Sequence, residues 1–127
     1  MFELVDAVER YAEFLPWCSG SECNFRDARI TRATLHINYR GIRQSFSTEN
    51  AKAPPALMQI KLVEGPFRML EGSWRFTGLG ETGCKVELSL RYEFSSRLLE
   101  TLVGPVFGYI ANSMVDAFVK RARSVYG

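Results

Sequence analysis

The sequence predicts an α+β fold in which a curved antiparallel sheet holds one long C-terminal helix. Between residues 32 and 94, apolar and polar side chains alternate in stretches that are separated by short turns. Turns of two to five residues join antiparallel strands, because parallel strands need a crossover of a dozen residues or more. Beyond Pro105 the apolar residues recur with helical spacing almost to the last residue.

Two short helices are expected at the N-terminus. The apolar residues that follow helical spacing are Phe2, Val5, Val8, Tyr11 and Phe14. Asp6, followed three residues later by Glu9, is a capping-box pattern that could start the second helix. Pro16 ends this region, because the residue before a proline is disfavoured in a helix.

Five alternating stretches are predicted to form the strands of an antiparallel meander. Arg40-Gly41 and Gly65-Pro66 are typical of turns, and Pro54-Pro55 closes the strand that runs from Ile42 to Glu49. On the other four strands, alternate apolar positions are expected to face inward. These are Ala33, Leu35, Ile37 and Tyr39; Met58, Ile60 and Leu62; Leu70, Gly72, Trp74 and Phe76; and Val86, Leu88, Leu90, Tyr92 and Phe94.

The C-terminal region is expected to begin with an N-cap at Ser95-Ser96. The helical pattern stops at Gly104 and resumes with Pro105 in a first turn, where the missing N–H of proline costs nothing. A long helix then runs nearly to Gly127. Its apolar stripe consists of Phe107, Ile110, Ala111, Met114, Val115, Phe118 and Ala122.

Composition places the chain among globular proteins. It has 127 residues, of which 46% are apolar and 24% are charged, so we expect one domain over residues 1–127. The first residues lack the basic start and the cleavage site of a secretory signal, and no apolar run reaches the length of a membrane span. These features favour a cytoplasmic protein.

The chemistry-bearing residues do not form a recognisable catalytic or metal motif. The spacing of Cys18, Cys23 and Cys84 fits no zinc knuckle, so all three are expected to be free, and the single histidine, His36, is expected on the outer face of a strand. Gly78-Leu79-Gly80-Glu81-Thr82-Gly83 matches a dinucleotide fingerprint, but a strand follows where that fingerprint needs a helix. We therefore expect a hairpin loop at these glycines. Because no metal or catalytic motif is recognised, we also expect that the protein binds no metal, has no catalytic residue and is not an enzyme.

The space between sheet and helix is the expected binding site for an apolar ligand. A strongly curved sheet around a single helix often leaves a gap at one end, although the same pattern also fits a solid core. The predicted ligand-binding residues are Trp74, Phe76, Leu88, Leu90, Tyr92, Phe107, Ile110, Met114 and Phe118. The segment Phe14, Leu15, Pro16 and Trp17 is the predicted gate.

Several motifs together give the chain a family resemblance. Val8-Glu9-Arg10-Tyr11, then Phe14 to Cys18, and later Glu64-Gly65-Pro66-Phe67-Arg68 with the alternating residues up to Phe76, resemble the START-like family of coenzyme Q-binding proteins and bacterial ribosome-association toxins, within the polyketide cyclase-like superfamily. The resemblance extends over essentially the whole chain. It implies a helix-grip fold with a ligand tunnel between the long helix and the sheet, and no catalytic apparatus.

Three functions follow from this resemblance. The first is binding of ubiquinone or a similar prenyl or acyl lipid in the tunnel, in support of respiratory quinone function or lipid transport, with contact to a membrane surface and no other cofactor. The second is binding to the large ribosomal subunit so as to block subunit joining, in which Arg26, Arg29, Arg32, Arg40 and Arg43 would face rRNA phosphates. The third is a polyketide cyclase or dehydratase activity, for which fold alone is a poor warrant.

Members of this family usually carry a further strand before the first helix. The present sequence begins inside that helix, so we expect the usual first strand to be absent from the sheet. An unpaired sheet edge favours dimerisation through that edge.

Overall fold

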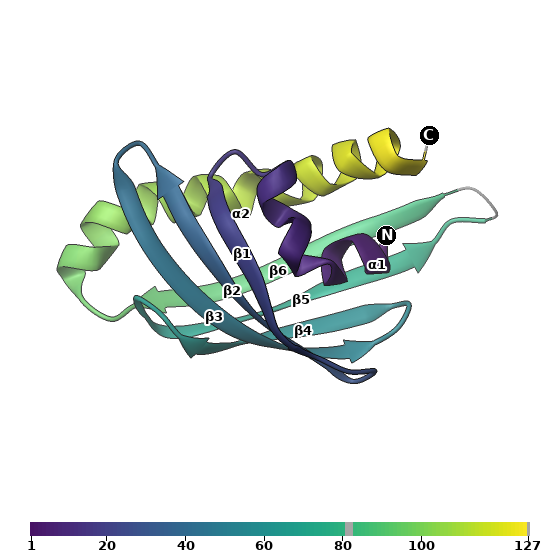
Figure 1. Cartoon of the computed structure of the whole chain (residues 1–127), viewed down its shortest axis with the longest axis horizontal. Coiled ribbons are helices and arrows are strands. Elements are labelled where there is room, and N and C mark those ends of the chain that lie inside the picture. The colour runs from purple at the N-terminus through teal and green to yellow at the C-terminus, as the bar shows by residue number, and fades with distance from the viewer. Residues whose placement is uncertain (81–82, 127) are drawn as a thin grey trace.

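The computed structural model describes residues 1–80 and 83–126, and it confirms the predicted helix-grip architecture. Six antiparallel strands lie in one sheet in the order β1-β2-β3-β4-β5-β6. The sheet curves around α2, which crosses it lengthwise, and the N-terminal helices lie beside the C-terminal half of α2 (Figure 1). The elements are α1 (Phe2–Asp6), a 3-10 helix η1 (Val8–Glu13), β1 (Cys18–Arg26), β2 (Ile30–Tyr39), β3 (Ile42–Ala53), β4 (Leu57–Glu64), β5 (Phe67–Gly78), β6 (Cys84–Phe94) and α2 (Arg97–Tyr126).

Strand β1 is the element that the sequence pattern missed. Its residues lack the Val, Ile and Thr that favour strands, and most of its side chains are exposed or half-buried. It forms because its backbone pairs with β2, in a register that joins Cys23 to Ala33 and Cys18 to Ile37. Two bulges interrupt this register, which is typical of a strand at a sheet edge.

Helix α2 is continuous, so the predicted break at Gly104 is wrong. Pro105 lies inside the helix and is exposed, whereas Val103, Val106 and Phe107 on either side of it are buried. Burial of these side chains against the sheet compensates for the hydrogen bond that the proline removes. The predicted N-cap is confirmed, because the Leu99 N–H donates to Ser96 Oγ at 3.1 Å.

The capping box predicted at Asp6 is also not formed. Ala7 precedes η1, and no side chain caps it. The Asp6 carboxylate instead accepts hydrogen bonds from Thr31 Oγ1 at 2.6 Å and Lys52 Nζ at 3.2 Å, which tie α1 to the sheet. Lys52 is buried and has no other carboxylate partner among the described residues, so it draws the Asp6 carboxylate away from η1.

The loop after β5 agrees with the hairpin expectation. Strand β5 ends at Gly78, β6 begins at Cys84, and the Leu79 N–H donates to the Gly83 carbonyl at 2.9 Å. Glu81 and Thr82 of the fingerprint lie outside the described residues. With a strand after the glycines, there is no helix N-terminus to hold a pyrophosphate.

Helix α2 is long and apolar enough to cross a membrane by length and composition alone, with a hydropathy of 1.4 over the window that meets this test. Such a helix is weak evidence of a membrane span, because helices that pack on a sheet pass the same test. Only 28% of that window is buried. The outer face of α2 carries the exposed side chains of Leu98, Leu102 and Tyr109.

Candidate functional site

A cavity of about 60 Å³ lies between the inner face of the sheet and α2. Its wall is formed by Val8 and Tyr11 of η1, by Trp17, by the sheet from β2 to β6, and by α2 with Phe107, Ile110 and Met114. The wall is almost entirely apolar and contains no charged side chain. The space is well below the roughly 150 Å³ of an engineered cavity that holds benzene, so it suits only a small molecule or a short piece of chain.

The predicted ligand-binding residues divide into two groups. Six of them line the cavity, namely Trp74, Leu88, Leu90, Phe107, Ile110 and Met114. The other three, Phe76, Tyr92 and Phe118, do not line it. Their role in ligand binding stays a prediction for both groups.

Aromatic clusters occupy the interior on both sides of the cavity. On one side, Phe118 packs against Tyr11, Phe14 and Trp74 with ring centroids 5.0–5.2 Å apart. On the other side, Phe107 packs against Phe67 at 4.9 Å and Tyr92 at 4.7 Å. These rings fill the space that an open tunnel would need, which explains the small volume.

Two polar residues in the cavity wall were missed by the sequence pattern. The inward positions of β3 are Phe46, Thr48 and Asn50, and all three are buried. Asn50 is 5% exposed, and its Oδ1 has no hydrogen-bond partner among the described residues. Extending the alternation past Phe46 would have flagged these positions, since a packed strand face is normally apolar.

The predicted gate lies between the cavity and the exterior. Leu15 and Trp17 are each 1% exposed, Phe14 is half-buried and Pro16 is exposed. Trp17 lines the cavity, and together with Phe14, Leu15 and Pro16 it also lines a surface groove against α2. Arg121 of α2 lies over the Phe14 ring at 5.1 Å and pairs with Glu13 at 2.6 Å, which fixes the segment against the helix. A gating role stays a prediction.

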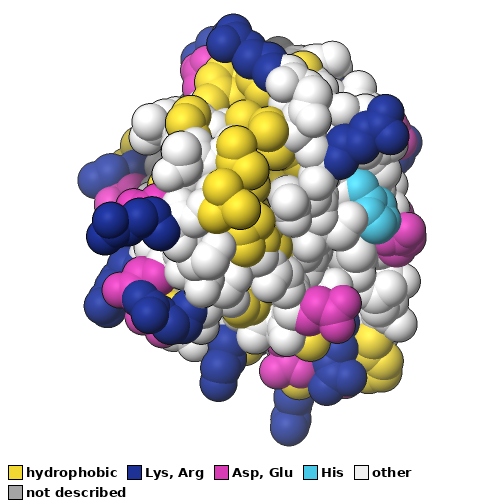
Figure 2. All heavy atoms as spheres, turned by 90° about the vertical axis from the view of Figure 1, so that its left-hand side faces the viewer, with side chains coloured by type: hydrophobic (Ala, Val, Ile, Leu, Met, Phe, Trp, Pro, Cys, Tyr) yellow, Lys and Arg dark blue, Asp and Glu magenta, His cyan; other side chains and the backbone are white. Residues whose placement is uncertain are grey.

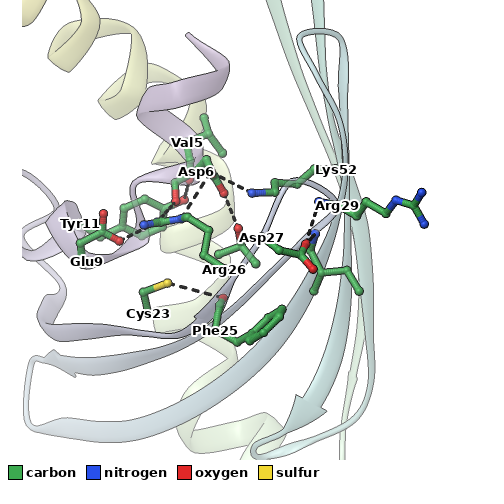
Figure 3. Close-up of polar contacts among 12 residues, drawn as sticks. Val5, Asp6, Glu9, Tyr11, Cys23, Phe25, Arg26, Asp27, Arg29 and Lys52 are labelled. Carbon is green, nitrogen blue, oxygen red and sulfur yellow. Dashed lines mark hydrogen bonds and ion pairs between the residues drawn. The ribbon is translucent and has the colours of Figure 1, made fainter.

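A polar cluster around the buried Lys52 side chain anchors α1 beside the cavity (Figure 3). Lys52 follows Asn50 on the inner face of β3, and its side chain is only 5% exposed where it pairs with Asp6. Arg26 also reaches this cluster and bonds Glu9 Oε2 at 2.7 Å. Burial alone would raise the pKa of Glu9, but the hydrogen bond and charge of Arg26 outweigh it and hold that pKa below its ordinary value.

A hydrogen bond to α1 fixes the side chain of Tyr11 in η1. The Tyr11 hydroxyl donates to the Val5 carbonyl, and burial raises the pKa of Tyr11 well above its ordinary value. Tyr11 therefore presents a neutral ring to the cavity. This hydrogen bond fixes the Tyr11 side chain against α1 at that end of the cavity.

The five arginines predicted to contact rRNA phosphates do not lie together. Arg26 is paired with Glu9 and Asp6, and Arg32 is paired with Glu49 at 2.8 Å. For Arg29, Arg40 and Arg43, no carboxylate of the described residues lies within ion-pair distance. Arg29 lies in the turn between β1 and β2, whereas Arg40 and Arg43 lie in the β2–β3 hairpin at the far end of β2.

The end of the molecule that carries the β2–β3 hairpin combines basic and apolar side chains. Figure 2 shows a hydrophobic band on this end with basic side chains on both sides of it. Tyr109 of α2 stacks on Tyr39 with ring centroids 5.0 Å apart, and Arg40 lies over the Tyr39 ring at 5.4 Å. This stack joins the hairpin to the helix.

His36 lies on the outer face of β2, as predicted. Its ring nitrogens bond Ser45 Oγ at 2.6 Å and Glu22 Oε2 at 2.8 Å, on the two neighbouring strands. Serine, histidine and glutamate are the residue types of a hydrolase triad, but β2 lies between β1 and β3, so its backbone N–H groups are used in the ladders. The arrangement therefore offers a polar surface rather than an oxyanion site.

Comparison with known proteins places the chain in a family. Residues 1–119 match the family described as polyketide cyclase / dehydrase and lipid transport. The chain belongs to this family. It is 42% identical over 127 residues to the ribosome association toxin RatA of Pseudomonas aeruginosa, covering all of this chain and 88% of the relative.

A more distant relative of this chain carries another name. It is 30% identical over 132 residues to the mitochondrial coenzyme Q-binding protein COQ10 homolog B of Xenopus laevis, covering all of this chain and 54% of that relative. The chain thus spans about half the length of the Xenopus protein. Neither relative is named as an enzyme, although the family description includes cyclases.

Solved structures share the fold. The 18 kDa protein CC1736 of Caulobacter crescentus is 29% identical, with a TM-score of 0.71 over 99% of this chain and 88% of that one. The Zhui aromatase/cyclase of Streptomyces sp. R1128 has a TM-score of 0.78 over 96% of this chain and 84% of that one, at 16% identity. At that identity the likeness to the cyclase shows the fold alone.

Proposed function

We propose that this protein associates with the large ribosomal subunit, through the end of the molecule where the β2–β3 hairpin meets α2, and thereby interferes with subunit joining. It acts in the cytoplasm and by binding rather than by catalysis. Similarity over the whole chain to a protein named a ribosome association toxin supports this function. The observation that carries the surface assignment is that Arg40 and Arg43, which have no carboxylate partner among the described residues, lie together at the β2–β3 hairpin beside the stacked rings of Tyr39 and Tyr109.

The backbone of Arg40 supports this assignment. Arg40 has a φ of 51°, in the left-handed region, and Gly41 beside it has a φ of 81°. A two-residue hairpin turn of this kind favours Asn, Asp or Gly at both positions. An arginine there costs about 1 kcal/mol of stability. A charge kept at an unfavourable backbone position is expected where that charge binds a partner.

The neighbouring side chains suit contact with a phosphate backbone. Arg43 lines a polar surface hollow together with His36, Asn38, Gln44 and Ser45. Arginine, histidine and amide side chains can all donate hydrogen bonds to phosphate oxygens. The exposed apolar side chains of Leu98, Leu102 and Tyr109 on α2 would add contact area that does not depend on charge.

Sucrose-gradient profiles of ribosomes with added protein test this function. The wild type is expected to increase free subunits at the expense of joined ribosomes. Arg40→Glu/Arg43→Glu should abolish that effect, whereas Arg75→Glu/Arg123→Glu, which changes the net charge equally at exposed positions elsewhere, should retain it. An unchanged subunit profile with the wild type would refute the function. Equal loss with both double variants would refute the assigned surface.

Binding of an apolar ligand in the cavity is a second candidate function. It is supported by the largely apolar wall of the cavity and by the lipid transport named in the family description. A whole prenyl tail is larger than the cavity, so ubiquinone would need the aromatic clusters to move apart. Extraction of the purified protein with organic solvent, followed by mass spectrometry, tests this function, and recovery of no apolar compound counts against it.

Membrane contact and dimerisation through a sheet edge stay predictions. Either would add to the two functions above without replacing them. Strands β1 and β6 are the edges of the described sheet.

A further inference from the structure

The inner face of β3 departs from the pattern of the rest of the sheet. Its inward positions run from Phe46 through Thr48 and Asn50 to Lys52, so the face becomes more polar along the strand. Lys52 is satisfied by Asp6 at 3.2 Å. Asn50 is not satisfied in this way, because its Oδ1 has no partner among residues 1–80 and 83–126.

The cavity wall contains a buried amide whose oxygen is unsatisfied among the described residues. Burying an amide group without a compensating hydrogen bond is unfavourable, whereas burying an apolar side chain of the same size is favourable. Asn50 is 5% exposed and lines the cavity. A primary amide carries both a donor and an acceptor, so either orientation of the side chain offers a hydrogen bond to a molecule in the cavity.

The rest of the cavity wall limits what that molecule can be. No charged side chain lines the cavity, so an ionic group would lose its hydration without a counter-charge. The Tyr11 hydroxyl already donates to Val5. The volume of about 60 Å³ allows only a few non-hydrogen atoms beside the amide.

We infer that the cavity binds a small neutral amphiphile, or the neutral end of a larger one, whose single hydroxyl or carbonyl group hydrogen-bonds the side-chain amide of Asn50 while its hydrocarbon part lies against Met114, Ile110 and Leu88. This inference rests on the second candidate function and adds the chemical class of the ligand. Asn50 is the residue that selects for the polar group. Thr48, buried two residues earlier on the same face, adds a hydroxyl to the wall.

Two four-carbon probes of similar size test the inference. We expect 1-butanol to bind the wild-type chain about tenfold more tightly than it binds Asn50→Leu, as the loss of one buried hydrogen bond predicts. The probe 1-chlorobutane, which lacks a hydroxyl group, should bind Asn50→Leu at least as tightly as the wild type. Titration followed by NMR should also shift the Asn50 side-chain amide signals with 1-butanol only, a measurement that needs no variant.

The outcomes separate the inference from the function on which it rests. Equal binding of both probes to the wild type, with unmoved Asn50 amide signals, would overturn the role of Asn50 and leave an apolar binding site. Binding of neither probe would overturn both, and would leave ordered water as the partner of Asn50. Thr48→Val, which keeps the side-chain shape, should weaken 1-butanol binding less than Asn50→Leu does.

Discussion

Lys52 Nζ lies 3.2 Å from Asp6 Oδ2, in an ion pair whose lysine side chain is 5% exposed and whose aspartate side chain is 17% exposed. The two residues are 46 positions apart in the chain, so this pair fastens the N-terminal helix to the middle of the sheet. Thr31 Oγ1 donates to the other carboxylate oxygen at 2.6 Å. A buried pair of this kind is expensive to break, because removing one partner leaves the other charge unpaired.

Asp6→Asn should therefore lower the free energy of unfolding by about 3–5 kcal/mol, since the Lys52 charge would remain buried without a counter-charge. Urea denaturation measures this. Glu3→Gln, on the same helix with an 80% exposed side chain, is the control and should change stability by less than about 0.5 kcal/mol. Adding Lys52→Met to Asp6→Asn should recover part of the loss. A loss below about 1 kcal/mol for Asp6→Asn would contradict this role.

Phe118→Ala should destabilise the protein by about 3–5 kcal/mol, because the ring is fully buried and contacts three other aromatic rings. The same change should enlarge the space beside Trp74 and increase the uptake of 1-chlorobutane. Thermal unfolding with and without this probe measures both effects. Val125→Ala, exposed on the same helix, is the matched control. A stable Phe118→Ala variant with unchanged probe binding would show that this cluster does not close the cavity.

Pro105→Ala should stabilise the protein by roughly 1–3 kcal/mol, because alanine restores the N–H that can bond the Thr101 carbonyl in a continuous helix. Pro105 is exposed, so little packing is lost. Asn112→Ala, at another exposed position of α2, should gain only a few tenths of a kcal/mol. A destabilising effect of Pro105→Ala would contradict a helix that continues through Gly104, and would favour the break that the sequence predicts there.

Most of the fold could be predicted because the signals are local. Alternation in Ala33, Leu35 and Ile37 reports which face of β2 is buried, and those three side chains are buried. Strand β1 could not be found in this way, since its exposed, small and polar residues carry no alternation and it is held by pairing with β2. The continuity of α2 across Gly104-Pro105 depends on burial against the sheet, which local propensity does not contain.

The candidate site was predicted less completely, for a different reason. Inward-facing residues such as Trp74 and Met114 follow from periodicity, and both line the cavity. Whether an inward residue lines a space or fills it depends on how the rings pack, so Phe118 and Tyr92 could not be told apart from the lining residues. The ion pair between Asp6 and Lys52 joins residues that are distant in the chain, so no local sequence pattern could predict it.

Binding to isolated large ribosomal subunits over a range of salt concentrations tests the central claim most directly. The wild type is expected to bind more weakly as salt increases, because contacts between arginines and phosphates release counterions. Arg40→Gln/Arg43→Gln should reduce the slope of log affinity against log salt by about two, while Arg75→Gln/Arg123→Gln leaves it unchanged. A wild-type affinity that does not depend on salt, or the same slope in the hairpin variant, would contradict ribosome binding through these two arginines.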